Sequence, residues 1–312
     1  MINRERIINT FCELAKIDSL SGQELDISKE LIKRLSNIGI KAKLDTYGNV
    51  VSQTNSEKTL ILSAHMDTVQ PGTNVKPIVT SDRISSDGTT ILGGDCKAGI
   101  TAILEGLTSL KEDRADYTDV EIIFTREEEI GLHGAQNLDF HKLNSKEAII
   151  FDGEGPVSQI TVESPTAIEF DIEITGRAAH AGVEPEKGIS AIRIAADLIT
   201  RLPQGRIDSE STFNIGRIHG GSVRNTVPEK TILNGEFRSL NMETVDSINI
   251  LLKDKIKEIQ TLYPDALIKE TILKNFESYQ ITDDDPVLIL SLIHISEPTR
   301  RTPISYAVFC LK

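Results

Sequence analysis

The sequence predicts an α/β fold that is interrupted by a second, α+β domain. Up to residue 152, short apolar runs of strand length alternate with stretches of helical periodicity, which is typical of an α/β layer around a largely buried sheet. From 164 to 272 the expected elements follow the order β-α-β-β-α-β, the split βαβ arrangement. A length of 312 residues suits one large or two ordinary domains.

The first part begins with two amphipathic helices. A turn at 19–22 separates them, and the second helix ends near Gly39. Apolar residues share one face of each helix: Ile7, Ile8, Phe11, Leu14 and Ala15 in the first, and Leu31, Leu35 and Ile38 in the second. A strand is expected at 59–64, and a long helical pattern opens at 93–95 and continues to Leu110. Two further buried strands are expected at 120–125 and 147–151.

The pattern changes after Asp152. Apolar residues alternate with acidic ones between Ile168 and Ile174, and this period of two indicates a strand with one solvated face. The remaining elements of this part are expected in chain order: a helix at 189–201, strands at 213–218 and 231–238, a helix at 245–259 and a strand at 266–270. The chain contains no internal repeat and no low-complexity linker.

Composition excludes several classes of function. A formal charge of −13 argues against a partner such as nucleic acid or an anionic membrane, because both need a basic face. Trp is absent and aromatics make up 4%, which disfavours a stacking platform for bases or sugars. The cysteines, Cys12, Cys96 and Cys310, lie far apart, which suits a reducing compartment. With no apolar run long enough for a membrane span or signal region, we expect a cytoplasmic protein.

Four short motifs are expected at strand ends or at the start of a helix, where ligands gather in open α/β sheets. In chain order they span 63–69 (SAHMDTV), 93–99 (GGDCKAG), 125–131 (TREEEIG) and 151–153 (FDG). Together they bring one imidazole and several carboxylates to one edge of the sheet. Crowded carboxylates repel one another unless a cation intervenes, and this donor set suits zinc, manganese or cobalt.

Each motif alone has a plainer interpretation. A single histidine after a strand is more often a hydrogen-bonded rim residue, and Asp95 would commonly be a helix cap. The run 127–129 would commonly be a solvated charge run, and Asp152-Gly153 is an ordinary turn. Their joint occurrence in this order favours the metal site. Cys96 could be a soft ligand, although we interpret it as an ordinary small residue.

These four motifs, in order and spacing, resemble the M20 family of dinuclear zinc peptidases, and most closely its tripeptide aminopeptidase branch. The resemblance covers residues 1 to about 290. It implies a mixed-sheet catalytic domain at 1–163, an inserted lid or dimerisation domain at 164–272, and a return to the catalytic domain at 273–290. It also implies a homodimer formed through the inserted domain, short peptide substrates, and two divalent cations, zinc above all, with cobalt or manganese as alternatives.

The resemblance gives each motif residue a role. His65 and Asp152 bind one cation, Asp95 bridges both, Glu129 binds the second, Glu128 is the general base and Asp67 orients His65. Glu127 stays a flanking residue, because the register Glu-Glu-x-Gly selects the two glutamates that follow it. In the inserted domain, His180 stabilises the oxyanion, while Asn225 and Arg238 hold the terminal carboxylate of the peptide.

The C-terminal part departs from the family pattern. Residues 291–312 resemble translated sequencing-adapter read-through, so we expect the natural chain to differ after about residue 290. The family has a last histidine ligand near its C-terminus; His294 lacks the expected surroundings and is not assigned. Asp95 and Glu129 alone would then hold the second cation. The alternatives are another M20-type amidohydrolase, such as a carboxypeptidase or deacylase, and an inactive, truncated metal-binding module.

Overall fold

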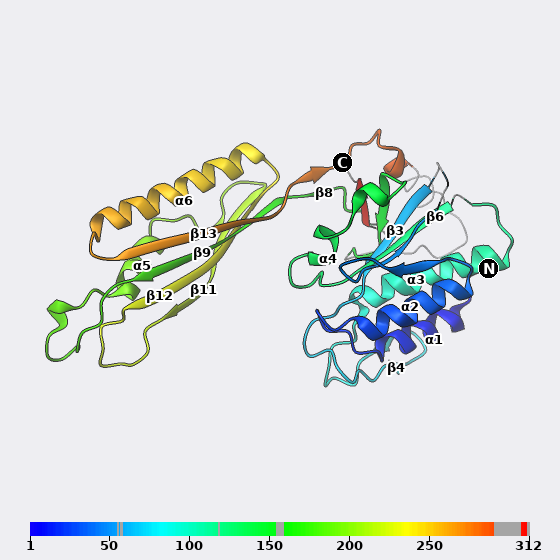
Figure 1. Cartoon of the computed structure of the whole chain (residues 1–312), viewed down its shortest axis with the longest axis horizontal. Coiled ribbons are helices and arrows are strands. Elements are labelled where there is room, and N and C mark those ends of the chain that lie inside the picture. Colours follow the sequence, from blue (N-terminus) through cyan, green and yellow to red (C-terminus); the bar gives the residue numbers. More distant parts are fainter. Residues whose placement is uncertain (55, 57–58, 118, 154–158, 290–306, 311–312) are drawn as a thin grey trace. The chain divides into compact units, whose positions relative to one another are not determined.

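The computed structural model describes residues 1–54, 56, 59–117, 119–153 and 159–289, and the backbone of 307–310. Contacts divide the chain into two compact units (Figure 1). Unit 1 comprises Met1–Val162 and Ile281–Lys312, and unit 2 comprises Glu163–Gln280. The expectation about residues 291–312 concerns a segment of which the structure describes only the backbone of Ala307–Cys310.

Unit 1 is built on a mixed six-stranded sheet with the order β1-β2-β6-β3-β7-β15. Its elements are α1 (Arg4–Ala15), α2 (Leu25–Asn37), β1 (Ala42–Leu44), β2 (Val50–Ser52), β3 (Thr59–His65), β4 (Ile78–Val79), β5 (Ile84–Ser85), α3 (Gly94–Glu112), β6 (Asp119–Thr125), α4 (His133–Gln136), β7 (Glu147–Ile150) and β15 (Ala307–Cys310). β3 is parallel to both β6 and β7, whereas the pairs β1–β2, β2–β6 and β7–β15 are antiparallel. The predicted α/β class with a mixed sheet is confirmed.

The central strands form where the sequence has its apolar runs. β3 and β6 coincide with the predicted strands to within one residue, and Ile61, Ile122 and Phe124 on them are buried. α3 packs on β3, and Figure 1 shows α1, α2 and α3 on the same side of the sheet. The hairpin of β1 and β2 was not predicted, because three-residue strands leave too short an alternation to recognise.

Gly99, in the first turns of α3, allows the helix to approach the segment after β7. A Cβ at this position would lie 2.0 Å from the carbonyl oxygen of Phe151 and 2.9 Å from Sγ of Cys96. We expect Gly99→Ala to lower the free energy of unfolding by about 3 kcal/mol, because α3 would have to move away from the backbone at Phe151. Gly106, on the same helix, has no atom within 4 Å of such a Cβ, so Gly106→Ala should raise stability by about 0.5–1 kcal/mol. Urea unfolding midpoints measure both effects, and equal shifts would contradict the close approach.

Unit 2 is an antiparallel sheet of order β10-β11-β12-β9-β13 with α5 and α6 packed on one face. Its elements are β8 (Glu163–Ser164), β9 (Thr166–Thr175), α5 (Ala191–Ile199), β10 (Gly205–Arg206), β11 (Ser211–Gly220), β12 (Lys230–Ser239), α6 (Met242–Leu262), β13 (Leu267–Phe276) and β14 (Tyr279–Gln280). Ile168, Phe170, Ile172 and Ile174 point into the core, as the alternation predicts. β13 runs beyond its predicted end because it pairs with β9 along nearly its whole length.

Candidate metal centre

The carboxyl ends of three adjacent parallel strands meet at one edge of the sheet in unit 1. His65 is the last residue of β3 and lies opposite Thr125, the last residue of β6. Ser63 lies opposite Ile150 of β7, so Asp152 follows two residues beyond this pair. The motifs at 63–69, 125–131 and 151–153 therefore converge, because parallel strands place their carboxyl ends on the same side.

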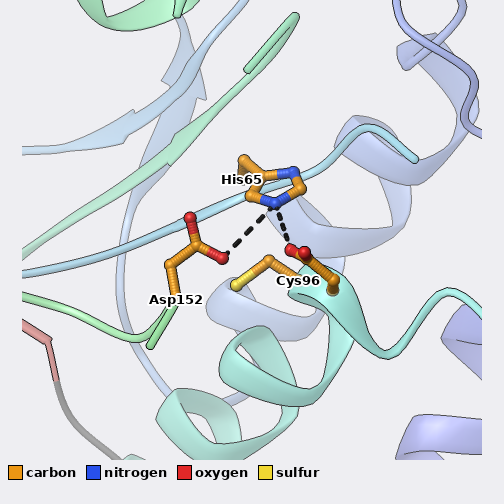
Figure 2. Close-up of side chains that lie close together, drawn as sticks. His65, Cys96 and Asp152 are labelled. Atoms are coloured by element: carbon orange, nitrogen blue, oxygen red, sulfur yellow. Dashed lines mark hydrogen bonds and ion pairs between the residues drawn. The ribbon is translucent and has the colours of Figure 1, made fainter. Parts of the chain in front are cut away.

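The imidazole of His65 lies at the centre of the converging side chains and is 2% exposed. Its Nε2 atom lies 2.7 Å from Oδ1 of Asp95, at the start of α3, and 3.5 Å from Oδ1 of Asp152. Figure 2 shows the imidazole facing the Asp152 carboxylate, with the sulfur of Cys96 beside them. The donor atoms of these four residues lie within 4.8 Å of one another. A second group of donor atoms, from His65, Glu128 and Glu129, meets the same limit.

The donor set fits a divalent cation. Two carboxylates that share one imidazole nitrogen repel each other unless a positive charge lies between them. Burial alone lowers the pKa of His65, but its contacts with Asp152, Asp67 and Asp95 outweigh burial and raise it far above its ordinary value. The contact with His65 in turn holds the pKa of Asp95 below its usual range. A cation bound at Nε2 would supply the positive charge that the proton otherwise provides.

Asp67 connects the imidazole to the turn that carries the two glutamates. Its carboxylate is buried and lies 3.4 Å from Nδ1 of His65. It accepts hydrogen bonds from the backbone N–H groups of Glu128, at 2.9 Å, and Glu129, at 3.1 Å, and from Oγ of Ser21, at 2.7 Å. Burial alone would raise the pKa of Asp67, but His65 and these partners hold it below its usual range, which favours the ionised form. One side chain thus lies beside the imidazole and holds the backbone of both glutamates.

The carboxyl groups of Glu128 and Glu129 are half buried. Burial raises the pKa of Glu128 to about 7, with the charge of His65 opposing this and those of Asp152, Glu129 and Asp67 adding to it. Burial also raises the pKa of Glu129. A carboxyl group whose pKa lies near neutrality suits proton transfer, because it can both accept and release a proton under ordinary conditions.

Glu127 points to a different set of partners and lies outside both donor groups. Its Oε2 atom accepts a hydrogen bond from the Tyr47 hydroxyl at 2.5 Å, and Oε1 lies 2.8 Å from Nη2 of Arg126. Its backbone N–H donates to Oε1 of Glu24 at 3.0 Å, and φ is +53°. The three consecutive glutamates therefore point in different directions, one into a structural network and two toward His65.

Glu24 is a supporting residue that the sequence did not reveal. It is 2% exposed and its Oε1 atom accepts from the N–H groups of Gly22 and Glu127. Its Oε2 atom lies 3.0 Å from Nη2 of Arg126. Glu24 and Glu127 are separated by 103 residues, and a single glutamate before a helix carries no sequence signal for such a contact.

We expect Glu24→Ala to reduce catalytic activity by about tenfold or more, because the turn that holds Glu128 loses its support. The same change should lower the free energy of unfolding by about 2 kcal/mol, since two partly buried N–H groups lose their acceptor. Glu24→Gln keeps one carbonyl oxygen as an acceptor, so its activity and its free energy of unfolding should lie between those of Glu24→Ala and the wild type. Glu13→Gln, which affects an exposed ion pair with Arg34, is the control and should change neither property. Equal activity in Glu24→Ala and wild type would contradict the supporting role.

The expected substrate-binding residues all lie in unit 2. His180 is exposed, and its Nδ1 atom accepts from the N–H of Gly182 at 3.2 Å. It forms a backbone bridge with Thr226, and the carbonyl of Asn225 accepts from Ala181, so His180 and Asn225 lie on adjoining loops. Arg238 lies elsewhere, on β12, where its guanidinium donates to Glu236.

Arg238 is separated from this loop pair along the sheet. The loop 221–229 starts and ends beside Lys230, since Gly221 donates to the Lys230 carbonyl. Arg238 is eight positions further along β12, which corresponds to about 26 Å. An extended tripeptide spans about 11 Å. One copy of unit 2 therefore does not bring Asn225 and Arg238 to the same carboxylate.

His294 lies outside the described residues. Within the part of the chain that the structure describes, no helix combines the length and the apolar character needed to cross a bilayer.

Two family models match the chain. The peptidase dimerisation domain of the M20 peptidases matches residues 162–263, and peptidase family M28 matches residues 48–159. The first match falls almost entirely in unit 2 and the second contains the residues around His65.

Solved structures decide the family. The aminopeptidase PepT from Bacillus cereus is 35% identical with a TM-score of 0.85, over 97% of this chain and 84% of that protein. A tripeptidase from Staphylococcus aureus is also 35% identical, with a TM-score of 0.88 over 98% and 85% of the two chains. The chain belongs to the M20 peptidase family. This M20 peptidase is similar to peptidase T, and it is a metallopeptidase.

Curated relatives agree with this assignment of the M20 peptidase. Peptidase T from Bacillus subtilis is 28% identical over 83% of this chain and 75% of the relative. The protein YqjE of the same organism, described as uncharacterized, is 41% identical over 79% of this chain and 70% of the relative. The chain thus spans about three quarters of the length of these relatives.

Proposed function

We propose that this M20 peptidase removes the N-terminal residue from short peptides, tripeptides above all, with Glu128 as general base. The observation that carries the proposal is the arrangement of two donor groups around one imidazole. His65, Asp95 and Asp152 lie on one side, and Glu128 and Glu129 reach the same imidazole from another strand end. Free Cys12 and Cys96 support a reducing compartment, so we propose a cytoplasmic enzyme.

Two divalent cations, zinc in our proposal, with cobalt or manganese as alternatives, would be held by the chain's own side chains. His65 and Asp152 would bind the first, Asp95 would bridge, and Glu129 would bind the second. When bound, a pair of divalent cations polarises a peptide carbonyl and lowers the pKa of a water molecule. Asp67, which belongs to neither set of ligands, keeps the imidazole oriented through Nδ1.

Glu128 would perform the proton transfers. Its carboxylate accepts the proton of the attacking water and then donates it to the nitrogen of the leaving amine. The N–H of Glu128 is fixed by Asp67, so the carboxylate starts from a constrained backbone position. Such positioning raises the rate because less conformational entropy is lost when the transition state forms.

Substrate binding by unit 2 would involve a second copy of the chain. His180 would stabilise the developing oxyanion, and Asn225 and Arg238 would bind the terminal carboxylate. Because Asn225 and Arg238 are far apart within one copy, we propose that the two residues at one site come from the two protomers of a homodimer. The match of residues 162–263 to the dimerisation domain supports this arrangement. Sedimentation analysis tests the dimer, and a monomer that retains full activity would exclude the shared site.

Two peptides and a chelator test the reaction. We expect hydrolysis of a free tripeptide, no hydrolysis of its N-acetylated form, and complete loss of activity with a chelator. An aminopeptidase needs the free amine, whereas a carboxypeptidase or deacylase would accept the blocked peptide. Hydrolysis of the acetylated peptide, or activity that survives chelation, would overturn the proposal.

The two cations should bind with different strength. The described residues offer His65, Asp95 and Asp152 to the first position, but only Asp95 and Glu129 are proposed for the second. Fewer protein donors give a weaker site, so dialysis should remove one equivalent and leave about one. Metal analysis before and after dialysis measures this, and retention of two equivalents would contradict it.

A further inference from the structure

Cys96 places a sulfur atom among the oxygen and nitrogen donors of the first cation position. Its side chain is 2% exposed, and its Sγ lies within 4.8 Å of donor atoms of His65, Asp95 and Asp152. Figure 2 shows the sulfur next to the Asp152 carboxylate, on the side of the imidazole where Nε2 points. The proposed reaction has no use for this thiol.

The spacing of the four donor atoms is near that of a zinc site. Zinc bond lengths of about 2.1 Å to nitrogen or oxygen and about 2.3 Å to sulfur put neighbouring donor atoms about 3.5 Å apart. Nε2 of His65 already lies 2.7 Å from Oδ1 of Asp95 and 3.5 Å from Oδ1 of Asp152, and no two of the four donor atoms are more than 4.8 Å apart, so shifts of about 1 Å or less would reach that spacing. The thiol donates to the carbonyl oxygen of Phe151 at 2.7 Å, and the sulfur would have to leave this partner to bind a cation.

Sulfur and oxygen donors prefer different cations. Thiolates bind soft, thiophilic ions strongly, whereas carboxylates favour hard ions such as Mn²⁺ and Mg²⁺. A hard ion is satisfied by the oxygen atoms of Asp95 and Asp152, so the thiol keeps its proton and its bond to Phe151. A soft ion gains a strong bond by recruiting the sulfur.

We propose that Cys96 is a conditional fourth ligand, which binds thiophilic divalent cations such as Cd²⁺ at the position formed by His65, Asp95 and Asp152. In this step the S–H bond breaks, the proton passes to solvent, and a sulfur–cation bond forms without any change in oxidation state. The inference rests on the metal position of the proposed function. A four-donor set closes the coordination sphere, so the soft ion would inhibit hydrolysis.

The test uses the chelator-stripped full chain with Cys12→Ala and Cys310→Ala, in which Cys96 is the sole thiol. Titration with Cd²⁺ should produce the ultraviolet sulfur-to-cadmium charge-transfer band, which saturates at one equivalent. Absence of the band in this protein overturns the proposal, whatever the behaviour of any further variant.

Adding Cys96→Ser to this background provides the matched comparison, because serine has nearly the same shape. The band should disappear and the affinity for Cd²⁺ should fall by about tenfold or more, while the affinity for Mn²⁺ changes by less than about threefold. Equal Cd²⁺ affinity with and without the thiol would also overturn the proposal. Tripeptide hydrolysis by the Zn²⁺-loaded protein without a Cd²⁺ band refutes this inference alone, whereas a Cd²⁺ band without hydrolysis under any cation refutes the proposed reaction alone.

Discussion

Replacing Glu128 with glutamine should lower kcat/KM for a tripeptide by about 10²–10⁴-fold, because the amide cannot accept a proton from water. The change keeps the size of the side chain and leaves the N–H bond to Asp67 in place. Metal content and the unfolding midpoint should therefore stay at wild-type values. Steady-state kinetics together with metal analysis make the measurement.

Glu127→Gln is the matched control, since it alters the neighbouring glutamate by the same atoms. Glu127 contacts Tyr47 and Arg126 rather than the cation position, so its replacement should cost much less activity than that of Glu128. If the Glu128 variant retains wild-type activity, or if kcat/KM falls equally in the two variants, Glu128 is not the base.

The pH dependence of kcat/KM gives a second measure of Glu128. The base must be ionised, so the rate should rise with pH through the pKa of Glu128. Burial raises that pKa to about 7, and the positive charge of a bound cation would lower it. The acid limb should therefore lie at or below about pH 7.

Replacing His65 with alanine should abolish tight cation binding and reduce hydrolysis to the background rate. His65 supplies the nitrogen ligand proposed for the first, tighter cation, and its loss leaves the carboxylates of Asp95 and Asp152 facing one another. Isothermal titration with Zn²⁺ measures the affinity directly. His141→Ala, at an exposed position on the short 3₁₀ helix Phe140–Lys142, is the control and should bind Zn²⁺ as the wild type does. A His65 variant that retains a full metal complement would refute the assignment of the centre.

The strands that carry the centre are predictable because their apolar runs are local. β3, β6 and β7 appear in the sequence as short buried segments, and a polar motif follows each of them. Once the strands are taken as parallel neighbours, convergence of His65 and Asp152 follows from geometry. The alternation in β9 is equally direct, since every second residue faces the core of unit 2.

The contacts that support the centre are not predictable in this way. Ser21 reaches Asp67 across 46 residues, and Glu24 reaches Glu127 across 103. Neither side chain belongs to a periodic pattern or a motif, and both acquire their partners only when α2 and the sheet pack together. The separation of Arg238 from Asn225 is equally hard to predict from the sequence, because it depends on the length and register of β12.

The hydrogen bonds of Asp67 have a consequence for how this enzyme evolves. The carboxylate that orients the imidazole also anchors the peptide bonds of both glutamates. A substitution at Asp67 would therefore disturb the surroundings of His65 and the backbone of Glu128 and Glu129 together. Cys96, whose thiol donates to the carbonyl oxygen of Phe151, is by contrast a position where the donor set could change while these backbone bonds stay in place.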